Sequence, residues 1–239
     1  AYEQSSDQEV AFQAVDYILR VLKKNMVFGM TWGRAMHEFV EQLAKDERLR
    51  SLSFQNVKVV PFLGTPGAIQ SDSWNTTTYS NTLATKVGNL LHCASYNLSA
   101  PMYVEGTKEK ELIESIDEIA KVLHMAETAD IALIGIGSMQ DDSSIIKAEI
   151  RTKEEYKELV RKGAVGEIVG RIYDKNGQTV DEDLKRKMVG ISLDKIAKIP
   201  VRVGMSYGKD KIEAIKGAIA GGLVNVLVTD VPTAELLLK

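Results

Sequence analysis

The stretch "VFGMTWGRAMHEFVEQL" (residues 27–43) places an apolar run directly before a segment with helical periodicity. The run stops at Thr31-Trp32-Gly33-Arg34, so it predicts a strand over residues 26–30 and a helix over residues 33–44. Only a few residues separate the two expected elements. An abrupt strand-to-helix connection of this kind is typical of α/β proteins.

The same alternation continues along the chain. Further apolar runs predict strands at residues 57–62, 101–104, 130–134, 164–173, 188–192, 200–205 and 224–228. Amphipathic segments predict helices at residues 10–22, 79–91, 107–123, 209–220 and 232–238, and residues 174–179, DKNGQT, are typical of a hairpin turn. Strands that are apolar throughout and alternate with helices need cover on both faces of their sheet. We therefore expect an α/β fold, a Rossmann-like parallel sheet with helices on both faces.

The composition is that of an ordinary soluble globular protein. The 239 residues are 44% hydrophobic and 26% charged, and 30 basic against 33 acidic residues give a net charge of -3. This balance argues against a nucleic-acid-binding surface on this chain, because such surfaces need clustered Lys and Arg. Cys93 is the only cysteine, which excludes an intrachain disulfide and fits a cytoplasmic protein. No apolar run approaches the ~20 residues of a transmembrane helix, so no membrane partner is expected.

In a parallel α/β sheet, ligands bind where strands end and helices begin. The first such turn offers an anion site, because a helix that starts at Gly33 points free N–H groups outward. Gly33 permits close approach of a ligand, Arg34 adds a positive charge and Thr31 adds a hydroxyl. The alternative is that Gly and Thr serve only the geometry of a tight turn. The spacing fits neither G-x-G-x-x-G nor G-x-x-x-x-G-K-[ST], so no nucleotide cofactor is expected.

A second glycine-rich turn follows the strand expected at residues 130–134. Gly135, Gly137 and Ser138 could wrap a polyol or a second phosphate, or could simply form the turn. Asp141 and Asp142 could bind a divalent cation. Adjacent acids in a loop are usually solvated, however, so we predict no metal site.

Two charged residues in the C-terminal half suggest contacts with a ligand. Glu167 lies inside an apolar segment, and a buried carboxylate needs partners. It could accept hydrogen bonds from sugar hydroxyls, act as a general base, or form a structural ion pair with Arg171 or another cation. Lys211 lies in the first turn of an expected helix, where a cation opposes the helix dipole. That placement suggests a nearby anionic ligand, although an exposed lysine is the alternative.

Several segments resemble one protein family. The sequences GAVGEIVGRIYDKNGQTV (163–180), MVGISLDKIAKIP (188–200) and KIEAIKGAIAGGLVNVLVTDVPTAELLL (211–238) resemble, in that order, the C-terminal part of SorC-type bacterial transcriptional regulators. The opening stretch and ADIALIGIGSM (129–139) resemble that family's first turn and its central strand-turn. The resemblance runs through nearly the whole chain, so residues 1–239 are expected to form one domain.

The resemblance implies an effector-binding domain whose fold is similar to sugar-phosphate isomerases and glucosamine-phosphate deaminases. A phosphorylated sugar or sugar alcohol would bind at the strand ends and alter how a separate N-terminal helix-turn-helix module, absent from this chain, holds operator DNA. It also implies a homodimer or homotetramer. Together with the turns above, it predicts a phosphate-binding group of Thr31, Gly33, Arg34, Ala35 and Lys211. The predicted sugar-binding group is Gly64, Thr65, Gly137, Ser138, Gln140 and Glu167.

The rival hypothesis is an enzyme on the same fold, a sugar-phosphate isomerase or deaminase. Glu167 would then be the base and Lys211 a phosphate clamp. Against this, no second acid or histidine is recognisably paired with Glu167, and His37, His92 and His124 lie in helical segments. We therefore predict a ligand-sensing domain with no catalytic residue.

Overall fold

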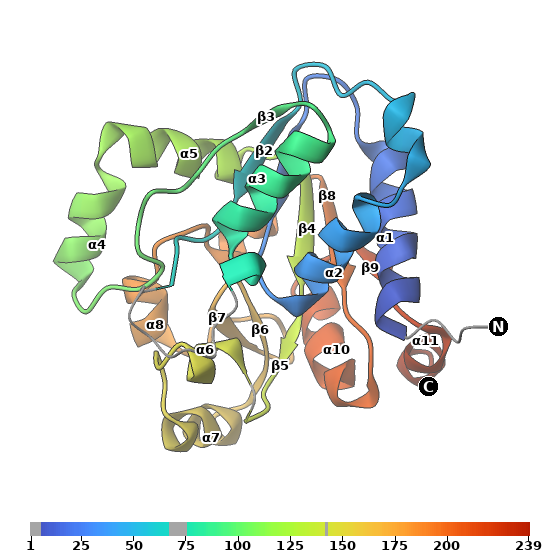
Figure 1. Ribbon diagram of the computed structural model, residues 1–239. Coiled ribbons are helices and arrows are strands. Elements are labelled where there is room, and N and C mark those ends of the chain that lie inside the picture. The colour runs from blue at the N-terminus through green and yellow to red at the C-terminus, as the bar shows by residue number, and fades with distance from the viewer. Residues whose placement is uncertain (1–5, 67–75, 142) are drawn as a thin grey trace.

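The computed structural model describes residues 6–66, 76–141 and 143–239. Its centre is a six-stranded sheet in the order β3-β2-β1-β4-β8-β9, and every neighbouring pair is parallel (Figure 1). The strands are β1 (Val27–Met30), β2 (Lys58–Pro61), β3 (Ala94–Ser95), β4 (Ile131–Gly135), β8 (Val201–Met205) and β9 (Val226–Val228). The predicted parallel sheet is therefore confirmed, although β3 was not expected and β9 begins later than residue 224.

The strand order places a topological switch at the middle of the sheet. The chain runs outward from β1 through β2 to β3, then returns so that β4 lies on the other side of β1. The connections that follow β1 and β4 therefore leave the sheet on opposite sides. Such a switch point leaves a crevice outside the carboxyl ends of the two strands, where ligands of open α/β sheets bind.

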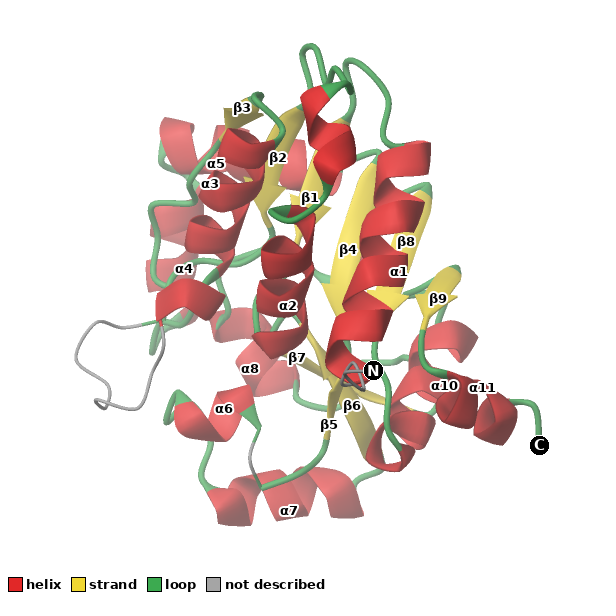
Figure 2. Ribbon diagram, turned by 45° about the vertical axis from the view of Figure 1, so that its right-hand side comes forward, coloured by secondary structure: helices red, strands yellow, loops and turns green. Residues whose placement is uncertain are grey.

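Alternate residues of the central strands pack into two separate helical layers. Phe28 and Met30 of β1 contact a core formed with α1 (Ser6–Val21), α2 (Arg34–Leu43) and α3 (Ser80–Leu90), the helices in front of the sheet in Figure 2. Ala132 and Ile134 of β4 belong to the core on the other face, with α5 (Asp117–Glu127) and α10 (Ile212–Ala220). Burial on both faces explains why these strands are apolar throughout.

A small antiparallel sheet extends the fold beyond the end of β4. It contains β5 (Gly137–Ser138), β6 (Ala164–Ile168) and β7 (Arg171–Asp174), in that order. The prediction of one strand over residues 164–173 is wrong, because Val169 and Gly170 adopt φ values of 55° and 69° and turn the chain back on itself. The β5–β6 pairing sets Glu167 opposite Gly137, next to the switch point.

Three other predicted elements differ from the structure. The helix expected over residues 107–123 is divided into α4 (Thr107–Glu114) and α5, because Ile116 is extended and the Ser115 hydroxyl donates to the Leu112 carbonyl at 2.7 Å. In the described chain, the strands expected at residues 101–104 and 188–192 form only isolated bridges. The hairpin turn expected at residues 174–179 is confirmed, since the Asp174 N–H donates to the Gln178 carbonyl at 2.9 Å.

The remaining elements are short helices and 3₁₀ turns. They are η1 (Glu47–Arg50), η2 (Thr76–Thr78), α6 (Ser144–Lys147), α7 (Lys153–Arg161), α8 (Glu182–Lys187), α9 (Leu193–Ile196), η3 (Lys209–Lys211) and α11 (Val231–Leu237). Across the described segments, no helix has both the length and the apolar character needed to cross a membrane.

Helix α10 packs directly against the β6–β7 hairpin. The Tyr173 hydroxyl donates to the Ala214 carbonyl at 2.9 Å. A Cβ on Gly217 would lie 2.8 Å from the Asp174 carbonyl oxygen and 2.9 Å from the Val165 side chain. The absence of a side chain at Gly217 therefore lets α10 and the hairpin pack together, and this contact fixes the hairpin against the large sheet.

We expect Gly217→Ala to lower the free energy of unfolding by about 1–3 kcal/mol, because the added methyl group must displace backbone. Helix propensity alone would give the opposite sign, a gain of about 1 kcal/mol. Urea unfolding followed by circular dichroism measures the difference. Lys216→Ala, at the neighbouring exposed position, is the control and should change stability by less than about 0.5 kcal/mol. Stabilisation by Gly217→Ala would contradict the close packing.

Candidate functional site

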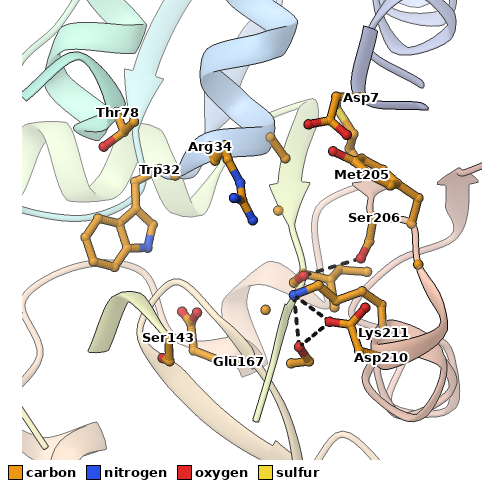
Figure 3. Close-up of a pocket in the computed structure, with 18 of the residues that line it drawn as sticks. Asp7, Trp32, Arg34, Thr78, Ser143, Glu167, Met205, Ser206, Asp210 and Lys211 are labelled. Carbon is orange, nitrogen blue, oxygen red and sulfur yellow. Dashed lines mark hydrogen bonds and ion pairs between the residues drawn. The ribbon is translucent and has the colours of Figure 1, made fainter. Parts of the chain in front are cut away.

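A cavity of about 590 Å³ opens at the carboxyl ends of β1, β4 and β8. Its walls are the turns that follow these strands, together with β6 and one residue of α1 (Figure 3). This volume is typical of a site for a small molecule. Of the predicted site residues, the cavity brings together Gly33, Arg34, Ala35, Gly137, Ser138, Glu167 and Lys211.

The turn after β1 forms one wall, with α2 starting at Arg34. Gly33 adopts a φ of 105° and its N–H donates to the Thr78 carbonyl at 2.9 Å, so this amide is occupied within the protein. The next two amides, of Arg34 and Ala35, have no hydrogen-bond partner in the described chain. The Arg34 side chain extends toward the middle of the cavity and forms no ion pair with any described residue (Figure 3). The wall therefore offers a guanidinium and two free amides.

Thr31 does not line the cavity. Its side chain is buried, and its hydroxyl accepts a hydrogen bond from the Gly135 N–H at 2.9 Å. The predicted role of this hydroxyl at the anion site therefore finds no geometric support, because the contact is internal. Its effect is to hold the end of β4 against the end of β1, which aligns two of the turns that form the cavity.

Lys211 contributes the opposite wall from the short η3 turn before α10. Its Nζ donates to Ser138 Oγ at 2.9 Å, and Ser138 Oγ donates to Asp210 Oδ2 at 3.1 Å. Lys211 and Asp210 also form an ion pair at 3.7 Å. The helix predicted from residue 209 thus begins as a 3₁₀ turn, and Gly208, with a φ of 106°, leads into it. The turns after β4 and β8 are joined by this group of three side chains.

Glu167 projects into the cavity from β6, and only 7% of it is exposed (Figure 3). One carboxylate oxygen accepts a hydrogen bond from the Gly170 N–H across the hairpin turn. Burial raises the pKa of Glu167 to about 7, although that hydrogen bond and the charges of Lys211 and Arg171 act to lower it. A Cβ on Gly137 would lie 2.8 Å from the other oxygen, so Gly137 leaves room for this side chain.

Arg171 does not pair with Glu167. In the described part of the chain, its guanidinium donates to the carbonyls of Met188 and Gly190, at 3.2 Å and 3.0 Å, and forms no ion pair. The alternative explanation for Glu167, a structural ion pair with Arg171, is therefore wrong. Among the described residues, the carboxylate has one hydrogen-bond donor, the Gly170 N–H, and it lines the cavity as a ligand-binding group would.

Besides Thr31, three more of the predicted site residues lie outside the cavity: Gly64, Thr65 and Gln140. The turn after β2 is bound to another segment: a Cβ on Gly64 would lie 2.6 Å from the Ala100 carbonyl oxygen, and the Thr65 hydroxyl accepts from Asn81 at 2.8 Å. Gln140 forms part of a turn through its backbone. The sequence could not show that the turn after β2 is filled by residues 100–102.

The cavity also contains residues that were not predicted. The indole of Trp32 faces it from the β1 turn, and Ser206 and Tyr207 line it after β8 (Figure 3). All three belong to strand-to-helix turns, so their position could have been inferred. Asp7 could not, because it comes from the first turn of α1 and reaches the cavity only through the packing of α1 beside α2. Burial, followed by the nearby Asp7 carboxylate, raises the pKa of Tyr207.

The structure gives no support for a metal site. The described residues contain no group of three His, Cys, Asp or Glu side chains that could hold an ion, and Asp142 lies outside them. Burial raises the pKa of the Cys93 thiol to about 11, which keeps it in the weakly nucleophilic thiol form at neutral pH.

Comparison with known proteins decides the family. All of residues 1–239 match the family model described as "Putative sugar-binding domain". The sorbitol operon regulator of Klebsiella pneumoniae is 30% identical over 222 residues, which cover 92% of this chain and 67% of that protein. The chain belongs to the sugar-binding domain family of SorC-type transcriptional regulators. It is also similar to the transcriptional regulator LsrR of Escherichia coli K12, at 30% identity over 230 residues, covering 95% of this chain and 67% of that protein.

Solved structures agree with this assignment. The crystal structure of the full-length sorbitol operon regulator SorC from Klebsiella pneumoniae superposes with a TM-score of 0.87 and 27% identity, over 100% of this chain and 75% of that one. The probable sor operon regulator from Shigella flexneri gives a TM-score of 0.86 and 26% identity, over 100% and 90% of the two chains. The predicted family and fold are confirmed. These relatives are regulators, which confirms the prediction of a SorC-type sugar-binding domain over an enzyme.

We expect Thr31→Val to lower the free energy of unfolding by about 1 kcal/mol, because it removes the acceptor of the half-buried Gly135 N–H. Thr31→Ser keeps the hydroxyl and should lose less. Chemical denaturation of both variants makes the comparison. Equal losses would show that the β1–β4 hydrogen bond is not what the threonine contributes.

The raised pKa of Glu167 predicts a pH-dependent stability. Between its ordinary value of 4.5 and about 7, the folded state binds a proton that the unfolded state has released. Stability should therefore fall as pH rises through this range, by up to about 3 kcal/mol. We expect Glu167→Gln to remove this component when unfolding is measured at about pH 5 and about pH 8. Glu158→Gln, at an exposed position of α7, should keep the wild-type slope, and an unchanged slope in Glu167→Gln would contradict the assignment.

Proposed function

We propose that this domain senses a phosphorylated sugar or sugar alcohol, which binds in the cavity described above. The observation that carries the proposal is the convergence of two cations, Arg34 and Lys211, on one small cavity whose third wall is a buried carboxylate, Glu167. Elements far apart in sequence supply these three groups: the start of α2, the η3 turn and strand β6. An anionic group and several hydroxyls on one small ligand would satisfy all of them.

The phosphate would bind at the start of α2. The free amides of Arg34 and Ala35 and the helix dipole favour an anion there. The Arg34 guanidinium can donate two parallel hydrogen bonds to phosphate oxygens. Lys211 would supply charge from the other side, with its Nζ already oriented by Ser138. The predicted phosphate-binding roles of Gly33, Arg34, Ala35 and Lys211 are kept in this proposal.

The hydroxyls of the ligand would bind at the other end, toward Glu167. A carboxyl with a pKa near neutrality can accept a hydrogen bond when ionised and donate one when protonated. Gly137 leaves the backbone of β5 open beside it, and Ser138 offers a hydroxyl. Thr31, Gly64, Thr65 and Gln140 have no part in this arrangement.

We further infer how ligand binding would regulate transcription. A helix-turn-helix module outside this chain would hold the operator, since this chain has a net charge of -3 and its relatives are named as regulators. The ligand could shift operator affinity only by the difference in its own affinity for two conformations. The two conformations would be two arrangements of the subunits in a cytoplasmic homodimer or homotetramer.

An isomerase or deaminase would need an acid or base that works with Glu167. Among the described residues that line the cavity there is no histidine, and the two other acids, Asp7 and Asp210, are engaged with Tyr207 and Ser138. The relatives are regulators. The site therefore supports binding rather than turnover.

A thermal-shift panel of hexose, pentose and polyol monophosphates tests the proposal. A ligand that occupies the cavity should stabilise the fold by mass action, by about 2.7 kcal/mol at 100 times its dissociation constant. Arg34→Ala and Lys211→Ala should each weaken binding by about 10-fold or more, because each removes a charge-assisted hydrogen bond. Lys45→Ala and Lys209→Ala, which remove exposed positive charges near the same two elements, are the matched controls.

Two results would contradict this proposal. Unchanged affinity in both Arg34→Ala and Lys211→Ala would show that the phosphate does not bind between the start of α2 and Lys211. Conversion of a stabilising ligand to an isomer or a deaminated product by the purified domain would restore the enzyme hypothesis.

A further inference from the structure

The charged side chains around the cavity are balanced. Among the described residues, the lining carries three cations and three acids: Arg34, Lys147, Lys211, Asp7, Glu167 and Asp210. The sum is zero when Glu167 is ionised and +1 when it is protonated. A site built for several phosphate groups would instead gather cations in excess.

The acids are placed beside the two cations that face the proposed phosphate. The Asp7 carboxylate and the Arg34 guanidinium both line the cavity, from the first turns of α1 and α2 (Figure 3). Asp210 forms an ion pair with Lys211 at 3.7 Å. A ligand phosphate at Arg34 would therefore bind the free amides of α2, and the carboxylates of Asp7 and Asp210 would line the same cavity.

A second phosphate on the same ligand would have to lie near a carboxylate. Toward α1 it meets Asp7, toward η3 it meets Asp210, and toward β6 it meets Glu167. Like charges brought together in one small site repel each other and weaken binding. Lys147 is the third cation of the lining, and it would have to offset this repulsion for a second phosphate to bind.

We propose that the cavity accepts a ligand with one phosphate group and rejects bisphosphates, and that Asp7 and Asp210 set this limit. This inference rests on the proposed function and narrows its class of ligand. Asp7 is the more informative residue, because it belongs to α1 and contributes to the cavity only through tertiary packing.

The test compares matched ligands by isothermal titration calorimetry. Fructose, fructose 6-phosphate and fructose 1,6-bisphosphate form one series, and ribulose, ribulose 5-phosphate and ribulose 1,5-bisphosphate form another. In the series that binds, we expect the dissociation constant of the monophosphate to be lower than that of the bisphosphate by about 10-fold or more. Asp7→Asn should reduce this ratio several-fold, and Asp210→Asn should do the same. Glu9→Gln removes a charge from the same helix at an exposed position and should leave the ratio unchanged.

The outcomes separate this inference from the proposed function. If a bisphosphate binds as tightly as its monophosphate, the inference is wrong and the proposed function stands; loss of that binding in Lys147→Ala would identify the residue that overturned it. An unchanged ratio in both Asp7→Asn and Asp210→Asn also overturns the inference. If no phosphorylated compound binds while an unphosphorylated sugar does, the proposed function fails and the inference fails with it. Wild-type protein gives the primary ratio, so a variant that fails to fold does not prevent the test.

Discussion

The hydrogen bond between the Thr31 hydroxyl and the Gly135 N–H, at 2.9 Å, fixes the geometry on which the rest of the site depends. It joins the ends of β1 and β4, the two strands between which the chain reverses its direction across the sheet. At the other end of the same pair, the Asp130 carboxylate accepts from the Val27 N–H at 2.7 Å. Because β1 and β4 are tied at both ends, the turns that follow them leave the sheet at a defined separation. The crevice between these turns is the cavity.

Around this crevice, the fold uses packing rather than flexible loops to position charge. Close approach of α10 to the β6–β7 hairpin, made possible by Gly217, holds Glu167 at the end of the large sheet. Lys211 is oriented by Ser138 and offset by Asp210. Only Arg34 extends into the cavity with no ion pair in the described chain. A site in which most groups are already oriented loses little entropy when a ligand binds, and an anion gains most at Arg34, which has no ion pair with a described residue.

Much of this arrangement could be predicted from the sequence, because it depends on local patterns. Apolar runs alternating with amphipathic segments predicted the parallel sheet, and the turn at Gly33 and Arg34 predicted a wall of the cavity. The predictions failed where a long-range contact determines the local structure. Residues 164–173 read as one strand because both arms of the hairpin are apolar, and only the antiparallel pairing of β6 with β7 shows that the chain reverses. The turn at Gly64 and Thr65 has the residues of a binding turn, yet residues 100–102 occupy its space.

The sequence by itself determined the class of fold and the strand-to-helix turns at which a ligand could bind, since these follow from periodicity and from residue types at short spacing. It also indicated the family, through the resemblance of several segments to SorC-type regulators. Only the tertiary structure decided which of those turns face one another. Hydrogen-bonding capacity and charge are properties of single residues, but their use depends on the nearest neighbours in space. Thr31 has a hydroxyl that could bind an anion, and packing assigns it to Gly135. Asp7 has no local signal at all, and the position of α1 beside α2 brings its carboxylate to the rim of the cavity.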